Sequence, residues 1–350
     1  MRTVEWNYTT DKFQMIDQRL LPGEFKVAVF TDYRDVAQAI TDMVVRGAPA
    51  IGAAAAFGMA LAAHQSKSAD IEALRDDLVA AASHLKKARP TAVNLAWAVD
   101  RIIRSTAAVQ GGTDDFREAV LTEAQAIADE DVAINKRMAA FGADLIDDGD
   151  TIIHHCNTGA LATVDWGTAL GVIRMAYEQG KKIHVLVDET RPRLQGARLT
   201  SWELIQYGIS FDIISDNAAG FFLRTGQVQK VFFGSDRTAA NGDVANKIGT
   251  YMLALAAYDN DVPRYAVVPT STIDLSLKSG DEITIEERDP SEVLGLTLLG
   301  RQVSPENASA RNPAFDVTPH RLVSAIVTEN GVVYPPYEVN IKSAVLGFSH

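Results

Sequence analysis

The sequence has a single cysteine, Cys156, so no disulfide can form within the chain. Its first ten residues, MRTVEWNYTT, lack the apolar core of a secretory signal, and the cytoplasm is therefore the expected compartment. The most apolar window, residues 48–63, is rich in alanine and glycine. It is shorter than the roughly 20 residues that a membrane helix requires, so we expect a tightly packed buried helix and no membrane span.

Two further features are missing: an excess of positive charge and the glycine-rich motifs that bind nucleotides. With 33 Lys and Arg residues against 45 Asp and Glu residues, the formal charge is −12, which argues against a nucleic-acid partner. An anionic substrate would then need a local cluster of Arg and Lys. No G-x-G-x-x-G follows the first strand of the predicted parallel sheet, and no G-x-x-x-x-G-K-[ST] occurs. We therefore expect no bound nucleotide and no cofactor.

The chain is otherwise ordinary for a globular protein, with 350 residues of which 47% are hydrophobic and 22% charged. This length predicts two compact domains. The β-prone runs at residues 3–8, 12–17 and 25–30 predict a small antiparallel sheet, and helical patterns then continue to Leu145. An acidic turn follows at residues 147–150. We place the boundary between domains 1–148 and 149–350 there.

After its strands, the first domain is expected to be helical, and the second is expected to be α/β. Helices are predicted at residues 34–45, 48–63, 70–88, 91–109 and 113–145, with Asp129 as a candidate break point in the last. From Thr151 onward strands and helices alternate, which predicts a parallel sheet with right-handed crossovers. The expected strands are 151–155, 182–187, 211–215, 229–233 and 265–269, and the expected helices are 166–179, 200–207, 218–223, 244–258 and 320–326. Residues 305–313 are expected to be rich in loops.

The stretch Val231–Gly249 is predicted to form a strand, a polar loop and the start of a helix. Asp236 follows the strand directly, at the place where ligands bind in open α/β sheets. Asn241 and Gly242 are expected to turn the chain, and Asp243 is expected to cap the helix. The alternative is that Asp236 is merely a solvated turn residue.

Four side chains at predicted helix N-termini could bind an anion. Asn246 and Lys247 would lie in the first turns of the helix after Asp243, where the helix dipole favours negative charge. Arg46 and Arg89 lie at junctions between predicted helices, which suits a phosphate. The alternatives are that Lys247 is an exposed helix cation and that Arg46 caps the preceding helix, for which Gly47 is the expected C-terminal breaker.

Two other predicted strands end in polar residues, Cys156 after the first and Asp188 with Gln195 after the second. Parallel strands end at one edge of a sheet, so a thiol, carboxylates and an amide would face one cleft. A lone cysteine is more often an inert core residue, but a helix after Cys156 could lower its pKa. The histidines in the apolar strands are expected to be core or supporting groups, so we predict no metal. They are His154, His155 and His184.

Seven motifs span nearly the whole chain: RGAPAIG (46–52), RPTAVNLAWAV (89–99), HCNTGALAT (155–163), DETRPRLQGARLTSWEL (188–204), DNAAGF (216–221), GSDRTAANGDVANKIGTY (234–251) and NPAFDVTP (312–319). Together, and in this order, they resemble the methylthioribose-1-phosphate isomerase family. The same fold is shared by regulatory subunits of the guanine-nucleotide exchange factor of translation initiation and by ribose-1,5-bisphosphate isomerases.

The resemblance implies a Rossmann-like second domain, a homodimer, and an aldose-ketose isomerase of methionine salvage. Such an enzyme converts 5-methylthioribose 1-phosphate to 5-methylthioribulose 1-phosphate. The resemblance also implies that Cys156 and Asp236 are the catalytic pair. It implies contacts with the substrate for Arg46, Gly47, Ala48, Arg89, Gln195, Asn246 and Lys247.

In this reaction the phosphate on the anomeric oxygen keeps the sugar from opening as a free hemiacetal, so an acid must protonate the ring oxygen. Asp236 suits this role if burial raises its pKa. Cys156 as a thiolate could then move a proton from C2 to C1 through an enediolate-like intermediate. The competing route is a hydride shift, in which Cys156 only orients or polarises the substrate.

Two other functions stay open on the sequence alone. The substrate could be another pentose 1-phosphate, such as 5-deoxyribose 1-phosphate or ribose 1,5-bisphosphate. The chain could also be a non-catalytic regulatory subunit that binds sugar phosphates or nucleotides. A binding module has no need of both Cys156 and Asp236, which favours an enzyme.

Overall fold

The computed structural model describes residues 1–90 and 92–347, and their contacts divide the chain into two compact units. The first unit contains Met1–Asn135 and Gly159–Gly167, and the second contains Lys136–Thr158 and Thr168–His350. The domain boundary expected between residues 148 and 149 stays a prediction. Within the described residues, no helix is both long enough and apolar enough to cross a membrane.

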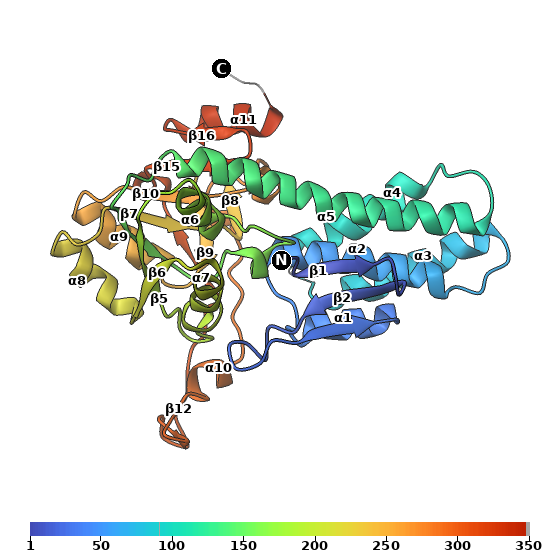
Figure 1. Cartoon of the computed structure of the whole chain (residues 1–350), viewed down its shortest axis with the longest axis horizontal. Helices are drawn as coiled ribbons and strands as arrows, with labels where there is room; N and C mark the ends of the chain where they lie inside the picture. Colours follow the sequence, from blue (N-terminus) through green and yellow to red (C-terminus); the bar gives the residue numbers. More distant parts are fainter. Residues whose placement is uncertain (91, 348–350) are drawn as a thin grey trace. The chain divides into compact units, whose positions relative to one another are not determined.

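The first unit begins with the expected antiparallel sheet (Figure 1, dark blue). Its strands are β1 (Val4–Asn7), β2 (Lys12–Ile16) and β3 (Val27–Phe30), paired in that order. Side chains alternate between the two faces of a strand, and Val4 and Trp6 of β1 are both buried. One face of the sheet therefore lies on the core of the first unit.

Five helices follow the sheet: α1 (Tyr33–Thr41), α2 (Ala48–Gln65), α3 (Ile71–Lys86), α4 (Val93–Thr106) and α5 (Thr113–Ala143), the last of which continues into the second unit. Residues 50–63 of α2 are all buried. Gly52 lies so near α4 that a Cβ atom would come within 3.0 Å of the Asn94 carbonyl oxygen. Small residues thus let α2 form the packed centre of the unit, and the predicted buried helix is confirmed.

Three predictions about helices of the first unit can be compared with their observed bounds. α1 ends at Thr41 rather than at residue 45, because Met43 has a φ of 58°, outside the helical region. α5 runs without interruption, so the candidate break near Asp129 is wrong. The predicted helix start at Thr91 lies outside the described residues, and α4 begins at Val93.

The second unit is built on a seven-stranded sheet in the order β16-β15-β10-β7-β4-β5-β6. Its strands are β4 (Thr151–His154), β5 (His184–Asp188), β6 (Ser210–Ile214), β7 (Lys230–Phe233), β10 (Arg264–Val267), β15 (Ala325–Thr328) and β16 (Gly331–Val333). Every neighbouring pair is parallel except β15 with β16. All residues of β7 are buried, as expected for a strand covered on both faces. The predicted α/β architecture is confirmed.

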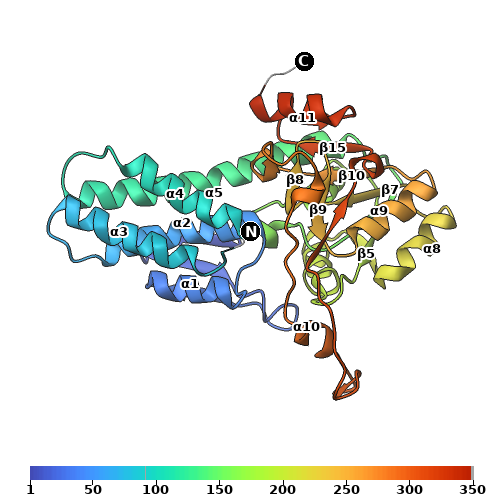
Figure 2. The same cartoon turned by 180° about the vertical axis from the view of Figure 1, so that it is seen from behind.

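Helices lie on both faces of this sheet. They are α6 (Ala169–Glu178), α7 (Ser201–Tyr207), α8 (Ala219–Arg224), α9 (Thr250–Asp259) and, beside β16, α11 (Tyr337–Leu346). Figures 1 and 2 together show α6 and α7 on one face of the sheet and α8 and α9 on the other. The helix predicted at residues 320–326 is wrong. Only a short 3₁₀ turn, His320–Leu322, precedes β15, whose β-branched residues favour a strand.

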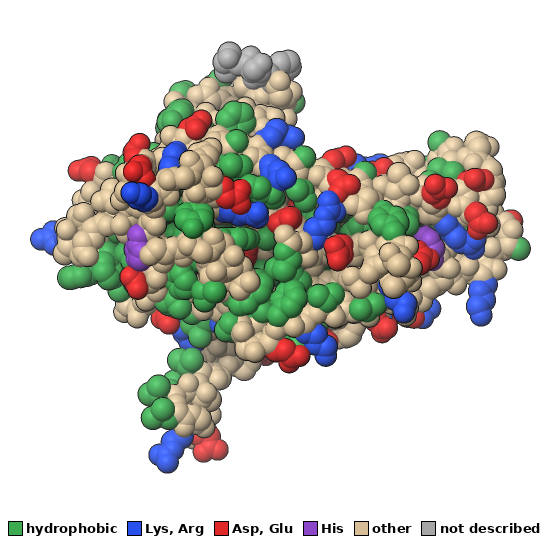
Figure 3. All heavy atoms as spheres, viewed as in Figure 1, with side chains coloured by type: hydrophobic (Ala, Val, Ile, Leu, Met, Phe, Trp, Pro, Cys, Tyr) green, Lys and Arg blue, Asp and Glu red, His purple; other side chains and the backbone are tan. Residues whose placement is uncertain are grey.

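An arm extends from the second unit in the lower part of Figure 1. It consists of α10 (Ser291–Leu294) and a hairpin of β12 (Thr297–Leu298) and β13 (Arg301–Gln302). Figure 3 shows apolar side chains near its tip, where Leu299 is 94% exposed. Residues 305–312 follow without a helix or strand, as expected for a loop-rich stretch.

We predict that Gly142→Ala destabilises the protein. Replacing glycine by alanine inside a helix usually raises the free energy of unfolding by roughly 0.5–1 kcal/mol. Here a Cβ atom on Gly142 of α5 would lie 2.4 Å from Cγ2 of Val172 on α6, so overpacking should cost about 1–3 kcal/mol. Urea unfolding measures the difference. The same change in a Val172→Ala background should cost less, and an equal cost in both backgrounds would contradict the proposed clash.

Candidate active site

The residues Asn246 and Lys247 lie on a strand and not on a helix. They belong to β9 (Val244–Lys247), which pairs antiparallel with both β8 (Arg237–Ala239) and β14 (Phe315–Thr318). A two-residue strand, β11 (Ile273–Asp274), extends this sheet beside β8. The first part of the predicted helix 244–258 is therefore wrong, because pairing with the distant β14 determines the conformation of residues 244–247.

The helix that follows, α9, begins at Thr250, with Gly249 at its N-cap. Gly249 has a φ of 102°, a conformation that side chains with a Cβ rarely adopt. The apolar residues Met252 and Leu255 have a spacing typical of a helix, and both lie in α9, where they are 69% and 38% exposed. Their spacing was therefore compatible with a helix but did not show where the helix begins.

Asp243 anchors the hairpin of β8 and β9 instead of capping a helix, which corrects the prediction made for it. Its carboxylate accepts hydrogen bonds from the backbone N–H groups of Gly280 at 3.0 Å and His320 at 2.8 Å, and from the Asn241 amide at 2.8 Å. Burial alone would raise the pKa of Asp243, but these hydrogen bonds outweigh it and hold the pKa below its ordinary value. The turn predicted at Asn241 and Gly242 is present between the two strands.

Asp236 lies between β7 and β8, at the carboxyl end of β7. Its backbone N–H donates to the Ala245 carbonyl oxygen at 2.9 Å, which fixes the start of the hairpin. The residue itself is exposed. The described chain therefore does not supply the burial that the sequence analysis set as a condition for the acid role of Asp236.

Lys247 and Asn246 are both buried, with 7% and 3% of their surfaces exposed. The Lys247 ammonium group donates to the Ala314 carbonyl oxygen at 2.9 Å and lies 4.3 Å from the centre of the Phe315 ring. The Asn246 amide donates to the Thr250 hydroxyl at 2.9 Å. The alternative that Lys247 is an exposed surface cation is therefore wrong.

Cys156 follows β4, which ends at His154, so it lies in the loop at the carboxyl end of that strand. Cys156 is buried and has a φ of 68°, a conformation that costs a non-glycine residue about 1–3 kcal/mol. Two threonines hold it there: its N–H donates to the Thr190 hydroxyl at 2.9 Å, and its carbonyl oxygen accepts from the Thr200 hydroxyl at 2.7 Å. Backbone strain maintained in this way is typical of functional sites. The roles of these threonines were missed from the sequence.

Cys156 and Asp236 follow neighbouring strands, because β4 and β7 are paired and parallel. The two loops also touch: a Cβ atom on Gly234 would lie 2.7 Å from Cγ2 of Thr158. The structure therefore brings both chain segments to the same edge of the sheet, as predicted from their positions at strand ends.

Gln195 lies close to the end of β5, in a buried position. Its side-chain oxygen has no hydrogen-bond partner among the described residues. The next residue, Gly196, approaches β5 so closely that a Cβ atom would clash with the Asp188 carbonyl oxygen at 1.7 Å. Burying an acceptor without a donor costs free energy, and a ligand that donates a hydrogen bond to it would remove this cost.

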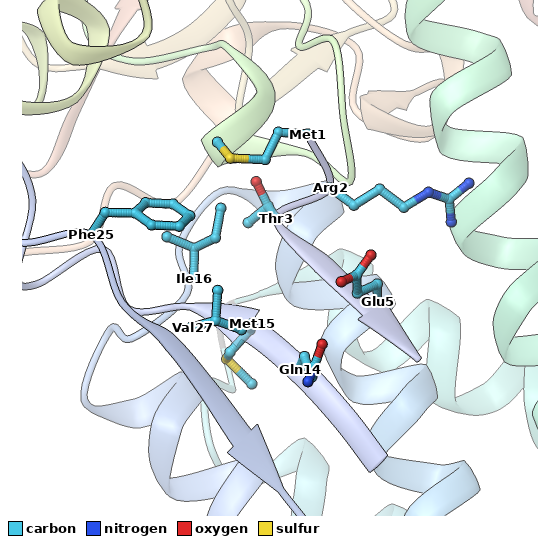
Figure 4. A pocket seen from close by; sticks show the side chains of 9 residues that line it. All are labelled: Met1, Arg2, Thr3, Glu5, Gln14, Met15, Ile16, Phe25 and Val27. Carbon is cyan, nitrogen blue, oxygen red and sulfur yellow. The ribbon is translucent and has the colours of Figure 1, made fainter. Parts of the chain in front are cut away.

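The remaining predicted site residues belong to the first unit. Gly47 is the N-cap of α2 and has a φ of 93°. It was predicted to end the preceding helix, and it instead begins α2. A Cβ atom there would lie 2.2 Å from the Ala162 carbonyl oxygen, so only glycine fits. Arg46, Ala48 and Arg89 are half-buried. The cavity of the first unit shown in Figure 4, lined by β1 and β2, contains none of these residues.

His155, Asp188 and Asp216 form a cluster whose ligand-type atoms lie within 4.8 Å of one another. Most of these atoms already have a partner: His155 Nδ1 bonds Asp188 Oδ2 at 2.8 Å, and the Asp216 carboxylate accepts from the backbone N–H groups of Thr190 and Arg191. Asp188 Oδ1 has no hydrogen-bond partner among the described residues. We therefore interpret the cluster as a hydrogen-bond network. The absence of a metal stays a prediction.

Comparison with known proteins supports a single family. A family model described as the Initiation factor 2 subunit family matches residues 44–335. Methylthioribose-1-phosphate isomerase from Fervidobacterium nodosum is 53% identical over 344 residues, covering 98% of this chain and 97% of that protein. The protein of the same name from Thermosipho africanus is 51% identical, covering 98% of both chains. The chain belongs to the methylthioribose-1-phosphate isomerase family.

Solved structures agree with this assignment. The 5-methylthioribose 1-phosphate isomerase from Pyrococcus horikoshii OT3 superposes with a TM-score of 0.92 at 48% identity, covering 98% of this chain and 95% of that one. A structure described as translation initiation factor eIF-2B, subunit delta, from A. fulgidus has a TM-score of 0.90 at 42% identity, covering 99% of both chains. The predicted family, fold class and isomerase class are confirmed, while the roles of individual residues stay predictions.

We predict that Asp243 stabilises the folded protein only above acidic pH. Because its pKa is lower when folded than when unfolded, the stabilisation is complete above the unfolded pKa of about 4 and is lost as pH falls through the folded value. At pH 7, Asp243→Asn should lower the free energy of unfolding by about 1–3 kcal/mol. Urea unfolding at several pH values measures this. A difference between the two proteins that did not shrink below pH 4 would contradict the assignment.

Proposed function

We propose that this chain converts 5-methylthioribose 1-phosphate to 5-methylthioribulose 1-phosphate in methionine salvage. The observation that carries the proposal is the pairing of β4 with β7, which sends Cys156 and Asp236 to one sheet edge. Relatives that bear the name of this activity, about half identical over nearly their whole length, support it.

Asp236 is proposed to protonate the ring oxygen, which allows a sugar with a phosphorylated anomeric oxygen to open. A carboxylic acid needs a raised pKa to stay protonated near neutral pH. Because Asp236 is exposed in the described chain, we infer that the bound substrate supplies the shielding from water.

Cys156 is proposed to act on the C2 hydrogen. As a thiolate it would remove the proton from C2 and return it to C1 through an enediolate-like intermediate. In the competing route a hydride moves directly from C2 to C1, and Cys156 orients or polarises the substrate. The strained backbone at Cys156 suits both routes, because each requires one fixed position for the sulfur atom.

The phosphate and sugar are proposed to be bound by buried polar groups and by cations that oppose the formal charge of −12. Lys247 supplies a cation in a partly apolar setting, and Gln195 an acceptor without a donor. The N-terminus of α2 suits a phosphate, because the positive end of the dipole of this 18-residue helix lies next to Gly47. Contacts with the same substrate are proposed for Arg46, Gly47, Ala48, Arg89, Gln195, Asn246 and Lys247.

Three further expectations accompany this proposal. The enzyme would work in the cytoplasm, as a homodimer and without a cofactor. Its substrate is a small sugar phosphate, and nothing in its composition favours a nucleic acid or a membrane as a partner.

A second candidate function is kept because of one comparison: a structure described as a subunit of a translation initiation factor is 42% identical to this chain. A regulatory subunit would bind sugar phosphates or nucleotides without turning them over. A third candidate is an isomerase of another pentose 1-phosphate.

We predict that the purified protein forms a ketose from 5-methylthioribose 1-phosphate. Its kcat/KM should exceed that for 5-deoxyribose 1-phosphate and ribose 1,5-bisphosphate by about tenfold or more. A site for the methylthio group would lose apolar contacts with the shorter 5-deoxyribose and would exclude a second phosphate. Assays of ketose formation with the three substrates measure this. Preference for the bisphosphate would change the assigned substrate, and no ketose from any of them would favour the regulatory function.

We predict that Asp236→Asn and Cys156→Ser each lower kcat by about 10²- to 10⁴-fold with a small change in KM, because both groups act on the reacting atoms. Steady-state kinetics of the two variants measure the effect. Lys247→Ala is the comparison variant, and it should mainly raise KM by removing a cation that binds phosphate. Near-normal turnover of Asp236→Asn would show that Asp236 is not the acid.

A further inference from the structure

The imidazole of His155 is hydrogen-bonded at both nitrogens. Nδ1 lies 2.8 Å from Asp188 Oδ2, and Nε2 lies 2.9 Å from the Ile248 carbonyl oxygen. A carbonyl oxygen can only accept, so Nε2 carries a proton. The Nδ1 contact then contains one more proton, shared as an imidazolium with a carboxylate or as an imidazole with a carboxylic acid. In either form the His155–Asp188 pair has no net charge.

His155 also determines where the loop after β9 lies. Its ring packs against Gly249 so closely that a Cβ atom there would lie 2.9 Å from Cε1 of the ring. Ile248, which accepts the Nε2 hydrogen bond, directly follows Lys247. On the other side of the loop, the Asp316 carboxylate accepts from the Gly249 N–H at 2.7 Å. The loop is thus held from two sides, and Lys247 is held with it.

The backbone of Asp188, rather than its carboxylate, is connected to Cys156. The Thr190 hydroxyl donates to the Asp188 carbonyl oxygen at 3.0 Å and accepts from the Cys156 N–H at 2.9 Å. The Asp216 carboxylate in turn holds the Thr190 N–H. One continuous network therefore joins the end of β4, the end of β5 and the loop after β9.

We propose that the His155–Asp188 pair is a positioning element, which fixes Asn246 and Lys247 relative to Cys156 while adding no net charge beside an anionic substrate. This inference rests on the proposed function for the role of Asn246 and Lys247 in binding. Neither His155 nor Asp188 touches the reacting atoms in this proposal. The pair acts through the backbone at Ile248 and Cys156.

Charge neutrality matters because acidic groups already surround the pair. Asp216 and Asp316 face His155 from η3 (Asp216–Ala218) and from β14, and Glu189 faces Asp188, while Lys247 is the nearby cation. Burial raises the pKa of the Asp188 carboxyl to about 6. Burial alone would lower the pKa of His155, but its hydrogen bond to Asp188 and the nearby carboxylates raise it. Both shifts favour retention of the shared proton.

The test compares three variants in steady-state kinetics with 5-methylthioribose 1-phosphate. Asp188→Ala removes the hydrogen bond to Nδ1, and His155→Gln leaves a buried carboxylate without its partner. Both should raise KM by about tenfold or more with a smaller change in kcat. Asp188→Asn can donate to Nδ1 while Nε2 still donates to Ile248, so its KM should stay within about threefold of the unmodified protein.

A matched control is available on the same strand. His184, at the opposite end of β5, bonds Asp212 at 3.0 Å in an exposed position. Asp212→Ala should therefore change neither KM nor kcat. The proposal is overturned if Asp188→Asn is as impaired as Asp188→Ala, or if His155→Gln lowers kcat while KM is unchanged.

A second measurement uses the unmodified protein without substrate, so it does not depend on whether a variant folds. Nitrogen-15 NMR of the histidines in the unmodified protein should show a His155 ring that keeps Nε2 protonated and titrates above its ordinary pKa of about 6.5. A ring that titrates near its ordinary pKa of about 6.5 would overturn the proposal. Absence of turnover would disprove the proposed function without changing this NMR result, so the two failures are distinguishable.

Discussion

The parallel pairing of β4 with β5 and β7 is the constraint on which the rest of the site depends. Parallel strands all release their chains at one edge of the sheet, so three loops from distant parts of the sequence must meet there. Three residues of β7, Val231, Phe232 and Phe233, are apolar and fully buried. They make this register costly to change, because a shift by one residue would reverse which side chains face the helices. The sheet therefore supplies a rigid base for side chains that have to be placed accurately.

The loops that follow these strands can adopt backbone conformations with positive φ, which a strand does not allow. Cys156 and Thr190 both have positive φ values, of 68° and 63°, and a hydrogen bond joins them. Two strained residues that support each other keep a geometry that neither would keep alone, provided the surroundings are rigid. The energy for this comes from the packed sheet and helices, which is why the strain can persist at its edge.

The strands from β1 to β7, β10 and most helices could be predicted, because runs of β-branched residues and helical periodicity are local properties of the sequence. β9 could not be predicted in this way. Its partner β14 lies about seventy residues further along the chain, and the pairing of Asn246 with Asp316 has no local signature. Asp243 was misassigned for the same reason, since its partners Gly280 and His320 are distant in sequence.

The candidate site shows the same division between local and distant information. Positions at strand ends located Cys156, Asp236 and Gln195, and the family resemblance named Lys247. Burial of Lys247 was not foreseen, and it has a physical consequence. An ammonium group removed from water interacts more strongly with an incoming phosphate than an exposed one does, because the effective dielectric constant is lower. Its own desolvation is offset by the Ala314 carbonyl oxygen and the face of Phe315, so a cation is tolerated in this buried position.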